Sequence, residues 1–231
     1  MSDIIYVHNG AMGDIIYSIP TVIAKGAGIY YITKEPMAIF LSPLLEVQKC
    51  IVQVKLGVPD VPYINLCAYR KVAISAIQQK VSKHLADSHL EAVGAKFDIS
   101  QRWLENVEPK SIFPIVVSRS LRYWGRLDWS PLKSMEKEIG FIGLKREFRW
   151  FVSETGINPG YIKVTNALEM AQAISGSKLF IGNQSLAFAI AEALKHPRVL
   201  EVCPGIENCG PIGSHGFIKI TEEILSEYTI I

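Results

Sequence analysis

The segment HNGAMGDIIYSIP, residues 8–20, places a carboxylate where a glycine-rich turn leads into a helix. Gly10 and Gly13 bracket the turn, which follows the apolar run Ile4–Val7. The segment has neither the G-x-G-x-x-G spacing of a dinucleotide site nor the lysine of a P-loop. An acid at a helix N-terminus competes with a bound phosphate, so this turn does not favour phosphate binding. Two roles remain for Asp14. It is either a helix cap or a general base that takes a proton from a hydroxyl.

A second glycine-containing turn follows the apolar run that opens LFIGNQSLAFAIAEAL, residues 179–194. Gly182 permits another group to approach the backbone closely, and Ser185 stands where the next helix begins. The Ser185 hydroxyl and the first N–H groups of that helix can hold an anion. The alternative is an ordinary turn in which Ser185 only caps the helix. The candidate anion-binding residues of this turn are Gly182, Asn183, Gln184 and Ser185.

A basic and aromatic segment, VVSRSLRYWGRLDW, occupies residues 116–129 and also begins with an apolar run. A guanidinium group can bind two phosphate oxygens at once, so Arg119 and Arg122 are candidate phosphate ligands. The alternative is a solvated basic loop whose tryptophans belong to the core, and we prefer that interpretation for Arg126. The segment therefore predicts a second group of anion-binding side chains.

Four further polar residues are candidates for lining a cleft: His8, Asn9, Glu201 and Asn208. His8 and Asn9 end the first apolar run, although for Asn9 we prefer hydrogen bonding within the turn. Glu201 interrupts the apolar run 199–202, where a carboxylate must be solvated or paired. Asn208 lies in a loop rich in glycine and proline.

The elements that would position these residues alternate between strands and helices. Strands are predicted over residues 4–7, 28–33, 51–56, 63–66, 112–118, 138–143, 178–181 and 198–202. Helices are predicted over residues 15–25, 68–93, 147–154, 168–175, 185–194 and 222–227. His84 and His89 lie on the charged helical stretch 68–93, and we predict that both are surface residues.

Strands separated by helices predict parallel sheets that are covered on both faces. A polar segment around residues 105–110 divides the chain. We therefore expect an α/β protein of two doubly wound, Rossmann-like domains, residues 1–108 and 109–231, that face a cleft. The final helix either completes the second domain or returns to pack on the first. Ligands of open sheets bind beyond the carboxyl ends of the strands, which is where the segments above lie.

The composition excludes several classes of protein. The chain has 231 residues, of which 49% are hydrophobic and 20% charged, and this balance is typical of a globular protein. A net charge of +2 is too small to indicate binding to nucleic acid. No apolar run reaches the roughly 20 residues of a membrane span, and no basic segment typical of a signal peptide precedes Ile4–Val7. The four cysteines lack C-x-x-C spacing, which indicates neither zinc nor disulfides. We expect a cytoplasmic protein.

The order of these segments resembles the GT-B glycosyltransferases of the heptosyltransferase type, glycosyltransferase family 9. That family opens with a strand, a Gly-Asp turn and a helix with an early proline, matched here by Gly13-Asp14 and Pro20. The basic segment that ends in tryptophan is matched by Arg122-Tyr123-Trp124, with a second tryptophan at Trp129. A strand that ends in glycine, with an acid four residues later, is matched by Gly143 and Glu147, and the Ala-rich helix turn by residues 182–194.

The resemblance implies a metal-independent transferase without a cofactor, in which Asp14 is the general base. The donor would be a nucleotide-diphosphate sugar and the acceptor an unidentified glycan or small molecule. Arg122 stands where the family has a phosphate-contacting lysine, and Glu147 would lie near the donor nucleoside. The residues implied to bind the donor are Gly13, Arg119, Arg122, Gly143, Glu147, Gly182, Asn183, Gln184 and Ser185.

The sequence also departs from the family in its donor-phosphate turn and in its first domain. Gln184-Ser185-Leu186 replaces Asp-Thr-Gly, Ala189 replaces a histidine, and only about 108 residues precede the second domain. Two other functions therefore stay open. One is a non-catalytic nucleotide- or sugar-binding protein that keeps the GT-B shell. The other is a nucleotide-sugar epimerase with paired acids across the cleft.

Overall fold

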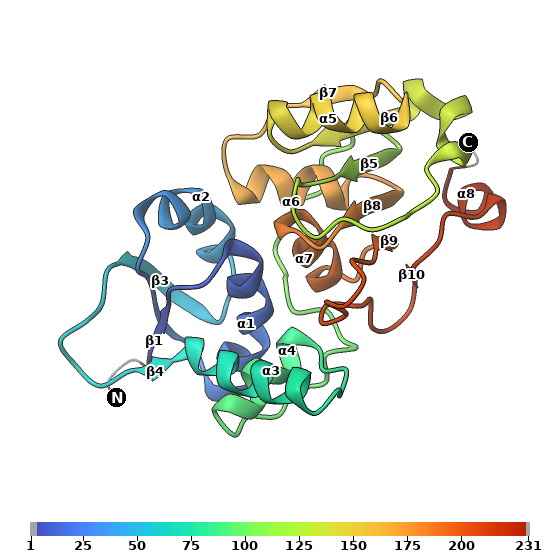
Figure 1. The fold of residues 1–231 in the computed structure, drawn as a ribbon. Helices are drawn as coiled ribbons and strands as arrows, with labels where there is room; N and C mark the ends of the chain where they lie inside the picture. Colours follow the sequence, from blue (N-terminus) through green and yellow to red (C-terminus); the bar gives the residue numbers. More distant parts are fainter. Residues whose placement is uncertain (1–3, 230–231) are drawn as a thin grey trace.

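The computed structural model describes residues 4–229 and has two parallel sheets, one from each half of the chain (Figure 1). Helices flank both sheets, so the expected α/β class is confirmed. Within the described residues, no helix is long and apolar enough to cross a membrane. The cysteines of the described chain are free thiols.

The first sheet has the strand order β3-β2-β1-β4. Its strands are β1 (Ile4–His8), β2 (Gly28–Ile32), β3 (Ile51–Leu56) and β4 (Ile64–Asn65). Its helices are α1 (Met12–Lys25), α2 (Glu35–Leu45), η1 (Leu66–Ala68), α3 (Tyr69–Gln78) and α4 (Leu85–Ala92). Because β1 lies between β2 and β4, the direction of winding reverses beside β1, and the residues after β1 and β4 face the same edge.

The second sheet has the strand order β10-β9-β8-β5-β6-β7. Its strands are β5 (Ile115–Ser118), β6 (Ile139–Ile142), β7 (Gly160–Ile162), β8 (Leu179–Asn183), β9 (Arg198–Glu201) and β10 (Gly216–Phe217). Its helices are η2 (Ser130–Glu138), α5 (Lys145–Thr155), α6 (Ala167–Ser175), α7 (Leu186–Ala193) and α8 (Glu222–Thr229). The winding reverses between β5 and β8, where Ser118 pairs with Gly182, and ligands of such sheets bind at this point.

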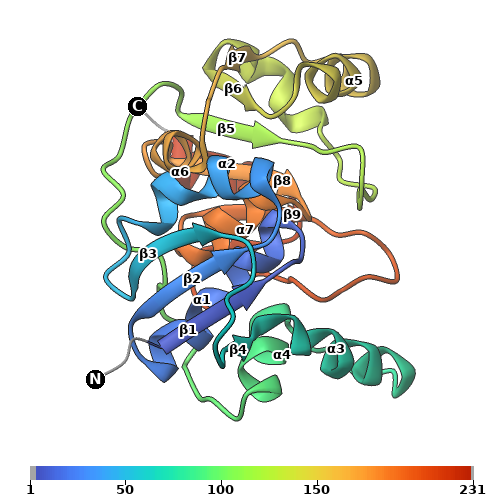
Figure 2. The ribbon, with the colours of Figure 1, turned by 90° about the vertical axis from the view of Figure 1, so that its left-hand side faces the viewer.

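The two halves pack directly against each other through their helices. In Figure 2, α2 lies next to α6 and α1 next to α7, and both pairs are in contact. One hydrophobic cluster runs through the contact and includes Ile15, Ile19 and Ala189. The segment that connects the halves follows the same seam, because the N–H groups of Trp103 and Leu104 donate to the Ala193 carbonyl at 3.0 and 3.2 Å. The halves therefore share a core along this seam.

The final helix belongs to the second half. Ile224 and Leu225 of α8 pack in the hydrophobic cluster that contains Val117 and Val199 of the second sheet. The alternative in which the last helix returns to the first half is therefore wrong. It fails because the apolar residues of α8 are covered by the second core.

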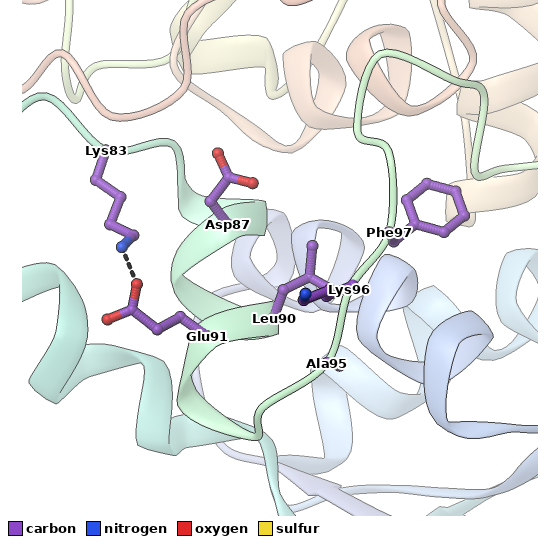
Figure 3. Close-up of a pocket in the computed structure, with 7 residues that line it drawn as sticks. All are labelled: Lys83, Asp87, Leu90, Glu91, Ala95, Lys96 and Phe97. Carbon is purple, nitrogen blue, oxygen red and sulfur yellow. Dashed lines mark hydrogen bonds and ion pairs between the residues drawn. The ribbon is translucent and has the colours of Figure 1, made fainter.

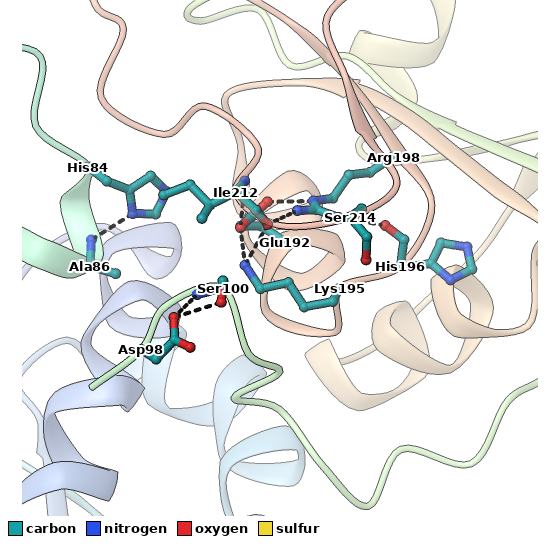
Figure 4. Close-up of polar contacts among 10 residues, drawn as sticks. All are labelled: His84, Ala86, Asp98, Ser100, Glu192, Lys195, His196, Arg198, Ile212 and Ser214. Carbon is teal, nitrogen blue, oxygen red and sulfur yellow. Dashed lines mark hydrogen bonds and ion pairs between the residues drawn. The ribbon is translucent and has the colours of Figure 1, made fainter. Parts of the chain in front are cut away.

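A buried charge network ties the glycine-rich loop after β9 to α7 (Figure 4). The Glu192 carboxylate is fully buried and accepts hydrogen bonds from Arg198 and Lys195. Arg198 is also fully buried, and its Nη2 donates to the Ile212 carbonyl at 2.6 Å. The Glu192 Oε1 atom accepts from the Ile212 N–H at 3.2 Å. Every ion of the network thus has a partner, which burial requires.

Removing Glu192 should destabilise the fold strongly. Glu192→Ala leaves the buried Arg198 guanidinium without its counter-ion, and we expect a loss of about 3–5 kcal/mol in the free energy of unfolding. Urea denaturation at neutral pH measures this loss. Glu222→Ala on the exposed face of α8 is the control, with an expected change within about 0.5 kcal/mol. Similar stabilities of the two variants would contradict the role given to the network.

Candidate functional site

The candidate site lies where α1 and α7 begin, at the carboxyl ends of β1 and β8. Gly13 sits in the first turn of α1, and a Cβ added to it would lie 3.8 Å from the Ser185 carbonyl oxygen and 3.8 Å from the Ala189 Cβ. The turn that carries Asp14 therefore faces the turn that carries Ser185. The sequence predicted both turns, and the structure brings them together.

Asp14 makes two hydrogen bonds with the same carboxylate oxygen. Its Oδ2 atom accepts from the Ala11 N–H at 3.1 Å, which caps α1 from inside the first turn. The same atom accepts from the Tyr69 hydroxyl at 2.7 Å. Asp14 is half-buried. The capping interpretation is thus correct, but the bond from Tyr69 is additional and orients the carboxylate.

Gly10 lies between the two polar side chains of this turn. A Cβ on Gly10 would come within 2.5 Å of the His8 ring and 3.0 Å of the Asp14 carboxylate. A glycine is required here because no side chain fits between them. The His8 ring is fully buried, and its Nδ1 accepts from the Gly10 N–H at 2.9 Å. His8 therefore fixes the conformation of the turn through this hydrogen bond.

Tyr69 belongs to a stack of rings behind Asp14. The ring centroids of Tyr69 and His89 are 4.0 Å apart, and those of His8 and His89 are 5.4 Å apart. Burial lowers the pKa of His8 to about 3, with a smaller contribution from the charge of Arg70. Burial likewise holds the pKa of His89 well below its usual range. Both rings are neutral at physiological pH, so they position their neighbours without carrying charge.

The prediction that His84 and His89 are surface residues is wrong. His84 is 8% exposed and His89 is 1% exposed, because α4 packs on α1. The His84 ring accepts from the Ala86 N–H at 3.2 Å and thereby caps α4. Its edge contacts the Tyr17 ring at a centroid distance of 5.2 Å. The charged residues of α4 thus lie on one face only.

Asn9 is hydrogen-bonded to Cys67, 58 residues further along the chain. Its N–H donates to the Cys67 thiol at 3.1 Å, and the thiol donates to the Asn9 Oδ1 at 2.9 Å. These bonds join the end of β1 to η1, which precedes Tyr69. The Asn9 side chain is thus engaged by a distant segment rather than by its own turn, and its role in lining a cleft stays a prediction.

Asn183 and Gln184 hold loops in place on the second half. The fully buried Asn183 accepts from the Ser120 N–H at 2.9 Å and donates to the Arg122 carbonyl at 2.6 Å. Gln184 accepts from the Cys203 N–H at 3.0 Å and donates to the Ile206 carbonyl at 2.5 Å. Their polar atoms are thus engaged with the backbone. In this structure they position the loops rather than face a ligand.

Two glycines allow the loops to approach the sheet. A Cβ on Gly182 would lie 2.6 Å from the Ser118 carbonyl oxygen across the β5–β8 pairing. A Cβ on Gly125 would lie 1.9 Å from the Val202 carbonyl oxygen. The sequence analysis singled out Gly182 and missed Gly125, although the latter stands directly after Trp124 in the basic segment.

Arg119 is a buried partner of Glu201. Its Nε and Nη2 atoms donate to the two carboxylate oxygens of Glu201 at 2.7 and 2.6 Å. The guanidinium also lies 4.5 Å from the centroid of the Trp150 ring. We expected Arg119 to bind a phosphate through two of its N–H groups. In this structure those groups bind the Glu201 carboxylate instead. The sequence required Glu201 to be solvated or paired, and its carboxylate is paired with Arg119.

Arg122 is an exposed cation of this loop. Its guanidinium lies 4.8 Å from the centroid of the Tyr123 ring, and Nη2 donates to the Tyr123 hydroxyl at 2.8 Å. Tyr123 has a φ of 54°, in the left-handed region that a tyrosine rarely adopts. The loop thus holds a strained residue next to its exposed arginine, and such strain is common at binding sites. Arg126 is exposed, as expected.

Ser185, Gly143 and Glu147 lie at helix starts of the second half. Ser185 is half-buried, and its hydroxyl accepts from the Phe188 N–H at 3.5 Å as the cap of α7. Glu147 accepts from the Leu144 N–H at 2.9 Å and caps α5. Gly143 precedes α5, and its carbonyl accepts from the Tyr161 hydroxyl at 2.8 Å. These residues lie beyond the ends of β6 and β8, where ligands of open parallel sheets bind.

Asn208 connects the loop after β9 to the first half. Its carbonyl accepts from the Leu85 N–H at 2.8 Å, at the start of α4. The neighbouring Glu207 carbonyl accepts from the Ser82 hydroxyl at 3.2 Å. Asn208 therefore lies at the contact of the two halves, although its backbone rather than its side chain makes this bond.

Two open cavities lie away from these residues. One, of about 380 Å³, is lined by Lys83, Asp87, Leu90, Glu91, Ala95, Lys96 and Phe97 (Figure 3). The other, of about 510 Å³, lies along the connecting segment and includes Arg102, Glu108 and His196. No predicted site residue lines either of them. The first cavity contains an ion pair between Lys83 and Glu91, so its charges are partly compensated.

Comparisons with known proteins identify the fold. No family model matches the chain, and no curated protein sequence gives a significant match. Solved structures do match. A glycosyltransferase family 9 protein from Veillonella parvula DSM 2008 superposes with a TM-score of 0.58 at 12% identity, over 99% of this chain and 89% of that chain. The chain has a GT-B fold.

Two heptosyltransferases share this GT-B fold. The E. coli heptosyltransferase WaaC with ADP matches with a TM-score of 0.55 at 11% identity, over 85% of this chain and 86% of that chain. The dodecameric iron-containing heptosyltransferase TibC of enterotoxigenic E. coli, in complex with ADP-D-β-D-heptose, matches with a TM-score of 0.54 at 17% identity. That match covers 96% of this chain and 64% of TibC. The resemblance inferred from the motifs thus extends to the fold.

Tyr69 and Cys67 contact the predicted site residues Asp14 and Asn9 without being predicted themselves. Tyr69 stands 55 residues after Asp14 in the chain and belongs to no recognisable motif. Only the pairing of β1 with β4 brings its helix next to Asp14. No local signal could have indicated this contact.

The buried histidines should make the GT-B fold acid-sensitive. Burial lowers the pKa of His8 and His84 to about 3 and that of His196 to about 4, from 6.5 in the unfolded chain. The unfolded chain therefore binds more protons below pH 6.5, and stability is highest above that pH. As the pH falls towards 4, each histidine removes up to about 1.4 kcal/mol per pH unit.

Urea denaturation of the wild type and His84→Gln at several values between pH 7.5 and about 4.5 tests this expectation. Glutamine can still accept the Ala86 hydrogen bond but does not titrate. The slope of stability against pH should therefore be smaller in the variant by about 1.4 kcal/mol per pH unit. Equal slopes would show that His84 does not resist protonation in the folded state.

Proposed function

We propose that this protein is a glycosyltransferase that moves a sugar from a nucleotide diphosphate to an acceptor hydroxyl. The observation that carries the proposal is the contact between the Asp14 turn of α1 and the Ser185 turn of α7. Each turn follows the carboxyl end of a parallel strand, and the exposed Arg122 lies beside the second turn through Asn183. Two structural neighbours are complexes with ADP or with ADP-D-β-D-heptose, which supports a nucleotide-sugar donor.

The donor would bind to the second half. Arg122 is an exposed guanidinium, and the N-terminus of α7 presents unpaired N–H groups and a positive dipole end. Together with Ser185 they can neutralise a diphosphate. Gly143 and Glu147, beyond the end of β6, would lie near the nucleoside. The assignment of residues 1–108 to the acceptor and 109–231 to the donor is part of this proposal.

The acceptor hydroxyl would be activated by Asp14. The oxygen of the acceptor hydroxyl attacks the anomeric carbon of the sugar while the bond from that carbon to the diphosphate oxygen breaks. The electron pair of the broken bond leaves with the diphosphate, and the hydroxyl proton passes to the Asp14 carboxylate. A single displacement of this kind inverts the anomeric configuration. Tyr69 would act as a positioning residue, because its hydroxyl fixes Oδ2 and leaves Oδ1 to accept the proton.

The proposed reaction uses no metal and no cofactor. The charge that develops on the leaving diphosphate would be stabilised by Arg122, Ser185 and the α7 N-terminus. Among residues 4–229, no group of three or more His, Cys, Asp or Glu side chains is placed to hold a metal ion. The free thiols are typical of a reducing compartment, and a cytoplasmic location belongs to the proposal.

A second candidate function is nucleotide binding without turnover. It is favoured by the loop-holding bonds of Asn183 and Gln184 and by the pairing of Arg119 with Glu201, which leave fewer groups for the leaving diphosphate. An epimerase would need a second acid opposite Asp14. Glu201, expected to line the cleft, is paired with Arg119 and offers no free carboxylate for that role, so this alternative gains no support.

Asp14→Asn should separate transfer from binding. The amide keeps the size of the side chain and can still accept the Ala11 and Tyr69 hydrogen bonds, but it is a very poor proton acceptor. We expect turnover to fall by about 10²–10⁴ with little change in stability or donor affinity. Asp14→Ala should also lose about 0.5–2 kcal/mol of stability, because the helix cap is lost.

The assay follows release of nucleoside diphosphate from a panel of nucleotide sugars and acceptors, with the exposed Asp60→Asn as the control. Full turnover by Asp14→Asn would make Asp14 a structural residue only. A wild type that binds donors but never transfers the sugar would favour the non-catalytic alternative.

Arg122→Ala should weaken nucleoside-diphosphate binding by about 1.5–3 kcal/mol, the contribution of a charge-assisted hydrogen bond. Arg126→Ala is the matched control, since Arg126 is also exposed and lies in the same loop. Isothermal titration calorimetry with the wild type and both variants measures the difference. Equal affinities for the two variants would remove Arg122 from the donor site.

A further inference from the structure

Helix α3 carries two large apolar side chains on its outer face, while Tyr69 lies on the inner face. Ile74 is 54% exposed and Ile77 is 67% exposed, whereas Ala76, on the face turned to the protein, is 8% exposed. Val81, in the turn after the helix, is also 55% exposed. A helix that faces water normally shows the opposite arrangement. A stripe of this kind indicates that the outer face meets an apolar partner.

Helix α3 lies at the edge of the molecule. It packs mainly on α4 and η1, and in Figure 2 it projects on the side where β1 and β5 end. Its first residue, Tyr69, donates the hydrogen bond to Asp14. The exposed stripe therefore lies on a helix that starts at the candidate site.

The charges around the stripe all have one sign. From residue 61 to residue 86 the chain has no Asp or Glu, but it has Arg70, Lys71, Lys80 and Lys83. Lys83 is paired with Glu91 of α4, while Arg70, Lys71 and Lys80 are exposed. This stretch carries four positive charges, whereas the whole chain has a net charge of +2. A basic surface beside exposed isoleucines has the composition of a helix that lies on an anionic bilayer.

We propose that the outer face of α3 binds the surface of an anionic lipid bilayer. Ile74, Ile77 and Val81 enter the boundary between headgroups and acyl chains, and Arg70, Lys71 and Lys80 contact the lipid phosphates. The bilayer is chosen over a protein partner because the stripe is short and apolar and the exposed charges of α3 and of the turn after it, Arg70, Lys71 and Lys80, are all positive. The proposal concerns adsorption alone and does not depend on the proposed transfer reaction.

Flotation of the full-length chain with lipid vesicles tests this surface. The wild type should float with vesicles of phosphatidylglycerol and phosphatidylcholine and much less with phosphatidylcholine alone, and salt should weaken the binding. Ile74→Ser with Ile77→Ser should lower the partition coefficient by at least about tenfold. Lys71→Gln with Lys80→Gln should lower it by about fivefold per charge and reduce its dependence on salt.

Ile39→Ser is the control, because Ile39 is 69% exposed but lies on α2. It should float like the wild type, and all variants should keep the melting temperature. Three outcomes would overturn the proposal. The first is a wild type that does not bind anionic vesicles, and the second is unchanged binding after the Ile74 and Ile77 substitutions. The third is a dimer, seen by light scattering, that these substitutions dissociate. The last result would make a second copy of the chain the occupant of the face.

Discussion

The close packing of α1 on α7 is the constraint on which the candidate site depends. Gly13 and Ala189 are small enough to let the two helix starts touch, and the contact is buried in a hydrophobic cluster shared by both halves. Because each helix follows the carboxyl end of a strand, this one contact places the Asp14 turn opposite the Ser185 turn. A Cβ at Gly13 would just reach van der Waals contact with Ser185 and Ala189, so a side chain bulkier than alanine at either position would separate the two turns.

The polar residues near this contact divide into two kinds. Those that are fully buried, such as Asn183, Glu192 and Arg198, are engaged with backbone groups or opposite charges and hold loops in place. Those that reach the surface, Asp14 and Arg122 above all, keep polar atoms that can meet a ligand. A buried polar group must find a partner within the protein, so the buried residues stabilise the conformation of the loops. The proposed function therefore relies on the residues that reach the surface.

The sequence predicts well whatever depends on local pattern. The alternation of strands and helices, the turns at Asp14 and Ser185 and the α/β class all follow from short-range spacing. Helix α2 was missed because Pro36 and Pro43 resemble helix breakers, although Pro36 occupies the first turn, where proline is tolerated. The partners of Arg119 and Asp14 were missed because Glu201 and Tyr69 stand 82 and 55 residues away. Such pairs arise only when the strands assemble.

A structure of the protein with a nucleoside diphosphate tests the central claim most directly. The account predicts that the diphosphate lies at the N-terminus of α7, within hydrogen-bond distance of the Ser185 hydroxyl and the Arg122 guanidinium. Asp14 should then lie across the contact on the side where the sugar would be attached. A diphosphate bound elsewhere, for example in the cavity along the connecting segment, would contradict the account, as would an empty α7 turn at saturating ligand.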